Sequence, residues 1–147
     1  MPGGTSPVQK LNSQLVDLLA THFMRRKEFG GLIDYTTDST VTGWAAGVTK
    51  EVRYKKIGKF IFFKIHISGT SNAITASATL PFPAVAGTQE WVFTCAGWDN
   101  GANVATVPVG TLAAGASTIN FYKDIGGTVW TNPGAKQVRC EGWYEAE

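Results

Sequence analysis

The side chains best suited to chemistry in this chain are tryptophans that stand beside turn residues. Trp98 is followed by Asp99 and Asn100, while Trp44 and Trp130 each adjoin a glycine-containing turn. An indole ring can stack on the C–H face of a sugar while an amide or a carboxylate bonds the sugar hydroxyls. We therefore treat these five residues as a candidate saccharide site. The competing interpretation, favoured on residue type alone, is that the indoles close the end of a β-sandwich, because large aromatic side chains are usually well buried.

Residues for catalysis form no recognisable constellation. The sequence contains no Gly-x-Ser-x-Gly, His-Glu-x-x-His or Gly-x-x-x-x-Gly-Lys motif. Its eleven carboxylates are scattered along the chain. A glycosidase pair such as Glu90 with Asp99 stays open as a minor alternative, because separation in sequence does not determine distance in space. We therefore predict no catalytic residues and expect the protein not to be an enzyme.

Cysteines and histidines are too few for a metal site. The chain has two cysteines, Cys95 and Cys140, and two histidines, His22 and His66, without the spacing of paired ligands. We expect no metal and no cofactor. The cysteines stand in strand-like runs and are expected to be small buried residues, although a disulfide between neighbouring strands stays open. His66 is expected on a strand surface.

The low charge content favours assembly. Charged residues make up 16% of the chain and the net charge is +2, so fewer side chains than usual are available to face water. A net charge this small does not indicate a nucleic-acid partner. Six of the thirteen basic residues lie between residues 50 and 64, and we expect a solvated strand face there, with a patch for an anionic partner as the alternative. The six are Lys50, Arg53, Lys55, Lys56, Lys59 and Lys64.

Targeting and membrane signals are not found in the sequence. The longest apolar stretch, residues 60–63, ends at Lys64 and is far shorter than the roughly 20 residues of a membrane helix. A secretion signal has a basic region followed by an apolar core. The first seven residues, MPGGTSP, contain neither of them. We therefore expect that the protein is made in a cytoplasm and does not insert into a membrane.

An apolar heptad seam lies near the N-terminus. Its members are spaced by 3, 4, 3 and 4 residues, which is the repeat of a coiled coil. They are Val8, Leu11, Leu15, Leu18 and His22. We expect an extended arm over residues 1–9 and a helix over residues 10–29. Because two heptads are marginal alone, the helix is either a self-association stalk or an element that docks on its own domain.

Beyond Gly31 the apolar period drops to two. Residues 48–55 and 60–68 alternate in polarity on either side of a tight turn, which predicts a β-hairpin. One face of the second strand then holds Ile61, Phe63, Ile65 and Ile67. Further strand-like runs cover residues 34–37, 74–80, 90–98, 104–109, 117–123 and 136–144, with a short run at 129–130. Eight or nine short strands separated by Gly and Asn turns predict an all-β sandwich or barrel.

The segment from Tyr54 to Thr70, YKKIGKFIFFKIHISGT, resembles a recurrent stretch in bacteriophage fibre and receptor-binding proteins. In that family a Tyr-x-x-Ile/Val-Gly-Lys turn leads into a long apolar strand, and a Leu-Pro-Phe-Pro segment follows, here residues 80–83. With residues 34–44, 118–122 and 138–144 the resemblance covers about residues 33–145. It implies a jelly-roll-like β-sandwich head, assembled as a homotrimer on a coiled-coil stalk, but it carries over no binding residues.

These observations predict three regions: an arm over residues 1–9, a helix or stalk over 10–29 and a β-sandwich head over 30–147. The leading hypothesis is a virion structural protein, a trimeric fibre or decoration head that attaches to a host-surface glycan or receptor. Its arm would dock on other virion proteins. The alternative is a monomeric carbohydrate-binding module that uses Trp98, Asp99 and Asn100 and does not need the helix. A small glycan-cleaving enzyme is the least favoured alternative.

Overall fold

The computed structural model describes residues 10–16, 31–87 and 89–147. By its contacts the chain divides into two units, Met1–Gly31 and Leu32–Glu147. The second unit contains all the described strands and confirms the all-β prediction. No described helix is long and apolar enough to cross a bilayer.

Residues 10–16 are helical, inside the predicted helix of residues 10–29. Leu11 and Leu15, two members of the heptad seam, are exposed there. The other seam members, Val8, Leu18 and His22, lie outside the described residues, as does the predicted arm. The coiled-coil stalk therefore stays a prediction.

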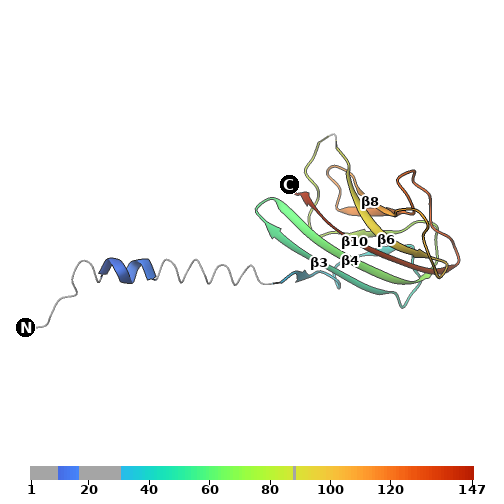
Figure 1. Ribbon diagram of the computed structural model, residues 1–147, viewed down its shortest axis with the longest axis horizontal. Helices are drawn as coiled ribbons and strands as arrows, with labels where there is room; N and C mark the ends of the chain where they lie inside the picture. Colours follow the sequence, from blue (N-terminus) through green and yellow to red (C-terminus); the bar gives the residue numbers. More distant parts are fainter. Residues whose placement is uncertain (1–9, 17–30, 88) are drawn as a thin grey trace, which may run out of the picture. The chain divides into compact units, whose positions relative to one another are not determined.

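The second unit is built from one curled antiparallel sheet (Figure 1). Its strand order is β1-β3-β4-β10-β6-β8-β9-β5-β2, and β7 pairs with β6. The strands are β1 (Ile33–Asp34), β2 (Val41–Thr42), β3 (Thr49–Ile57), β4 (Phe60–Ser71), β5 (Ser77–Thr79), β6 (Trp91–Asp99), β7 (Ala102–Asn103), β8 (Val109–Leu112), β9 (Thr118–Tyr122) and β10 (Gly134–Glu145).

Strand β6 connects the two halves of this sheet. Its residues 95–99 pair with β10, while residues 91–94 pair with β8. The long strands β3, β4, β10 and β6 lie side by side (Figure 1). An isolated bridge between Trp44 and Ser71 brings the chain after β2 back to the end of β4. The sheet therefore curls until the segment that follows β2, the last strand in this order, meets the end of β4.

The predicted hairpin is strands β3 and β4. Ile57 pairs with Phe60, so Gly58 and Lys59 form a two-residue turn in which Gly58 has φ 60°. A glycine at the first turn position suits the tight turns that match strand twist. Along β4, the residues at positions 61, 63, 65 and 67 are buried while Phe60, Phe62 and Lys64 are exposed and His66 is half-buried. The period-2 assignment of the two faces is confirmed.

The buried faces of both sheet halves meet in one core. Phe63 of β4 and Phe93 of β6 pack edge to face, with ring centroids 4.8 Å apart. Cys95 and Cys140 lie opposite each other on β6 and β10, both buried and both free thiols. Their predicted burial is confirmed.

Strand β8 differs from the prediction for residues 104–109. The strand begins after Pro108 and extends to Leu112, because proline lacks the N–H that a ladder needs and is tolerated at a strand start. Gly110 also lowers the apparent strand propensity, yet a Cβ at this position would lie 2.8 Å from Ile119 Cδ1. A side chain at position 110 would therefore have to displace the end of the Ile119 side chain.

Candidate functional site

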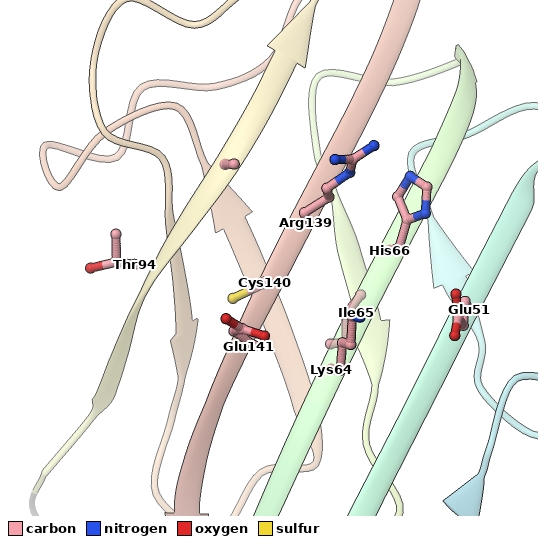
Figure 2. Close-up of a pocket in the computed structure, with 9 residues that line it drawn as sticks. Glu51, Lys64, Ile65, His66, Thr94, Arg139, Cys140 and Glu141 are labelled. Atoms are coloured by element: carbon pink, nitrogen blue, oxygen red, sulfur yellow. The ribbon is translucent and has the colours of Figure 1, made fainter. Parts of the chain in front are cut away.

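The outer face of the four long strands carries a polar groove of about 380 Å³ (Figure 2). Its polar residues alternate with core residues along the strands and so point away from the core. A volume of this size lies within the range of ligand sites. We call it the outer-face groove, and its six polar residues are Glu51, Lys64, His66, Thr94, Arg139 and Glu141.

Antiparallel pairing aligns these residues in two rows across the strands. In one row, His66 of β4 lies between Glu51 of β3 and Arg139 of β10. In the next row, Lys64 lies opposite Glu141. Figure 2 shows these side chains on neighbouring strands of the same face. The groove therefore offers donors and acceptors within one short stretch of sheet.

Gln137 connects His66 with Arg139. When its amide oxygen faces them, it accepts hydrogen bonds from His66 Nε2 at 2.7 Å and from Arg139 Nε and Nη2 at 3.2 and 3.1 Å. The neutral imidazole then keeps Nδ1 as an acceptor. This network holds the guanidinium and imidazole groups in fixed positions.

The electrostatic environment keeps His66 neutral. Burial lowers the pKa of His66 from its ordinary value of 6.5, and the positive charges of Arg139 and Lys64 lower it further, while Glu51 acts in the opposite direction. At pH 7 the groove therefore contains two cations, Lys64 and Arg139, and two carboxylates, Glu51 and Glu141. Its charges cancel.

Trp98 lies beside the groove and contacts Arg139, one of its lining residues. The Arg139 guanidinium carbon lies 5.2 Å from the centroid of the Trp98 ring, a cation–π distance. Trp98, Ser68 and Gln137 also line a more apolar depression of about 300 Å³. Among the tryptophans singled out from the sequence, Trp98 is therefore the one placed beside the groove.

Asp99 and Asn100 shape the loop after Trp98. Asp99 accepts hydrogen bonds from Thr131 Oγ1 at 2.7 Å and from Lys123 Nζ at 3.0 Å. Burial by itself would raise the pKa of Asp99, but the hydrogen bonds from Thr131 and Lys123 outweigh it and place the pKa below 3.8. Asn100, with φ 53°, and Gly101 form the turn between β6 and β7. The Asp99 carboxylate therefore holds the β9–β10 loop against the end of β6.

Trp44 and Trp130 are buried. Trp44 Nε1 donates to the carbonyl of Lys136 at 3.1 Å, and Trp130 Nε1 donates to the carbonyl of Phe121 at 2.8 Å. Neither indole lines the outer-face groove. Both rings belong to the core, where their N–H groups are satisfied.

A buried cation, Lys136, occupies the core side of β10. Its side chain is 1% exposed, and Nζ donates to the carbonyls of Gly43, Ala73 and Thr75 at 2.8, 2.9 and 2.9 Å. Burial lowers the pKa of Lys136 from 10.5 to about 8, although Asp99 acts in the opposite direction. In the sequence Lys136 begins the strand-like run of residues 136–144, and no local pattern indicates that it is buried.

The six basic residues between 50 and 64 do not form a single patch. Arg53 pairs with Glu51 at 2.8 Å, and Lys50 donates to the carbonyl of Ser39. Lys56 lies 4.3 Å from the centroid of the Phe82 ring. Lys64 lines the groove. The alternative of one anionic-partner patch therefore has no geometric support.

The glycosidase pair of Glu90 and Asp99 is excluded by geometry. Strand β6 extends from Trp91 to Asp99, so the two carboxylates lie at opposite ends of a strand roughly 30 Å long. Paired glycosidase carboxylates lie within about 10 Å of each other.

Within residues 10–16, 31–87 and 89–147, no three His, Cys, Asp or Glu side chains gather as a metal site.

Sequence reasoning missed most of the groove. Alternation along residues 60–68 places His66 on a strand surface, and the same alternation along residues 136–144 could have placed Gln137 and Arg139 on an outer face. No local pattern shows that β4 pairs with β10.

Comparison with protein-family models, curated proteins and solved structures finds no match for the chain.

Proposed function

We propose that this chain is the head of a bacteriophage fibre or receptor-binding protein that binds a neutral host-surface saccharide in the outer-face groove. The observation that supports a saccharide as the ligand is the groove itself, where Gln137 holds Arg139 and His66 beside Trp98. Sugar hydroxyls donate and accept at once, so they suit a site that mixes carboxylates with cations. An aromatic ring at the end of the groove supplies a stacking surface.

The assembly follows from the heptad seam and the resemblance of residues 54–70 to phage fibre proteins. In this proposal the curled sheet is a jelly-roll-like head, and the helix forms the coiled-coil stalk of a homotrimer. The arm over residues 1–9 docks on other virion proteins. Multiple grooves in one particle would strengthen a weak saccharide contact by avidity.

The test is titration calorimetry of the intact chain against a panel of neutral and anionic fragments of bacterial surface polysaccharide. We expect a neutral fragment to bind and Arg139→Gln to weaken that binding at least about tenfold, since a hydrogen bond from a charged group is removed. Lys59→Gln is the matched control, because Lys59 is an exposed cation in the β3–β4 turn. Equal affinities for the wild type and Arg139→Gln would show that the saccharide does not bind in the outer-face groove.

A monomeric carbohydrate-binding module is the second candidate, favoured by the position of Trp98 beside the groove. It predicts a monomeric mass for the intact chain and unchanged saccharide affinity after removal of residues 1–29. The fibre-head proposal predicts a trimeric mass and an apparent affinity for multivalent saccharide that falls after this removal.

A further inference from the structure

The outer face of the sheet ends in a cluster of exposed aromatic side chains. Phe60, Phe62 and Trp143 are 44%, 41% and 48% exposed, and Val92 is 49% exposed. Phe62 lies opposite Trp143 across β4 and β10. The Trp143 ring lies 5.5 Å from Phe60 and 5.6 Å from Trp91, centroid to centroid. We call this cluster the aromatic end; it consists of the exposed residues Phe60, Phe62, Val92 and Trp143 together with the half-buried Trp91.

The aromatic end is large enough to be part of an interface. At about 200 Å² for a large side chain, it exposes roughly 400 Å² of apolar surface, which for a monomer is often functional. A stable interface takes about 800 Å² from each partner. The aromatic end supplies about half of this area, so neighbouring polar residues must contribute the rest.

The row next to the aromatic end is divided in charge. Arg53 and Lys64 are on the β3 and β4 side, and Glu141 is on β10. Glu145, also on β10, and Glu90, just before β6, add negative charge on the same side as Glu141. In the described part of the chain, neither Lys64 nor Glu141 has an ion-pair partner. The β3–β4 side of this row, which we call the positive flank, is therefore complementary in charge to the β10 side, which we call the negative flank.

A partner that carries the same surface satisfies both features. Rotation of a second copy about an axis parallel to the strands keeps the aromatic ends together and exchanges the two flanks, so Lys64 meets Glu141 of the next copy. Rotation about an axis across the strands would bring like charges together, which is unfavourable. The charge pattern therefore selects one kind of rotation axis.

We propose that the aromatic end is a self-association interface, in which chains pack around an axis parallel to the strands and Lys64 of one copy pairs with Glu141 of the next. This interface is carried by the sheet and is additional to the heptad seam. It depends on no ligand, so its failure and the failure of saccharide binding are separate results. The row of Glu51, His66 and Arg139 comes next along the strands, beyond Lys64 and Glu141.

The first test is the concentration dependence of mass of the full chain, measured by sedimentation equilibrium. We expect Phe62→Lys to weaken association at least about tenfold, because a charge would be buried without a partner. Ile125→Lys, at a side chain that is 75% exposed outside the aromatic end, should leave association unchanged. Circular dichroism checks that each variant is folded. A monomeric wild type, or equal association of Phe62→Lys and the wild type, would overturn the proposal.

The second test reverses the charges. Lys64→Glu and Glu141→Lys should each weaken association several-fold through repulsion, whereas the double variant Lys64→Glu/Glu141→Lys should regain wild-type association. Both positions are surface residues, so folding is not at risk. An equimolar mixture of the two single variants should associate more strongly than either alone. A double variant no better than the single variants would contradict the pairing.

Discussion

His66 shows how one residue depends on its neighbours in the outer-face groove. Its ring is bonded to Gln137 and faces Arg139, Glu51 and Lys64 from the adjacent strands and its own. Neutral imidazole can both donate and accept, which suits a hydroxyl-bearing ligand. Protonation would remove the acceptor and give the groove a net positive charge.

The first prediction at this scale concerns pH. Because the folded pKa of His66 lies below 6.5, the unfolded state binds the proton more readily in this window. The contribution of His66 to stability is present above pH 6.5 and is lost as the pH falls from 6.5 through the folded pKa. Urea titrations at pH 7 and pH 5 should therefore show a larger loss in the free energy of unfolding for the wild type than for His66→Gln. Equal losses would contradict this assignment.

At the scale of elements, Lys136 joins the last strand to two loops. Its ammonium group binds carbonyls at residue 43, which follows β2, and at residues 73 and 75, between β4 and β5. Gly43 must be glycine here, because φ is +96° and a Cβ would lie 1.9 Å from the Thr75 carbonyl oxygen. The curl of the sheet is thus closed by a cation with its ligands rather than by a continuous ladder.

Replacement of Lys136 tests whether its bonds to the three carbonyls stabilise the curled sheet. Lys136→Met should lower the free energy of unfolding by about 3 kcal/mol at pH 7, because three carbonyls lose their donor. Lys59→Met is the exposed control and should change little. The folded pKa of about 8 lies below 10.5, so the Lys136 contribution to wild-type stability rises with pH between these values, and Lys136→Met should lack this rise. Burial raises the pKa of Tyr144, so its contribution falls above pH 10 in both proteins.

At the scale of the whole molecule, the proposed saccharide site and the proposed self-association interface lie next to each other on the same sheet face. The outer-face groove and the aromatic end share the row of Lys64 and Glu141. Self-association through the aromatic end would place several grooves in one particle, and multivalency then raises avidity without any new ligand contact. The heptad seam would add a second connection between the chains.

Removal of residues 1–29 tests this division. Because residues 32–147 form their own contact unit, the shortened chain should stay folded, with a thermal midpoint within a few degrees of the intact protein. Its mass by light scattering should fall from the trimer, and the association that is left should depend on Phe62. A shortened chain that fails to fold would show that the N-terminal region is part of the head.

The sequence by itself determined the local features of residues 32–147. Alternation of polarity separated buried Ile61 and Ile65 from exposed Phe62 on β4, because successive side chains point to opposite faces of a strand. A glycine-containing turn between two alternating runs was enough to predict the β3–β4 hairpin. These features depend on residues a few positions apart, so they can be read along the chain.

Tertiary structure decided which of these local features meet. The pairing of β4 with β10 placed His66 beside Arg139, and closure of the curled sheet buried Lys136 under distant carbonyls. A lysine in an alternating strand is expected to face water, and only a ring of carbonyl acceptors makes its burial favourable. The energy of such contacts comes from segments far apart in the sequence, so no local pattern could show it.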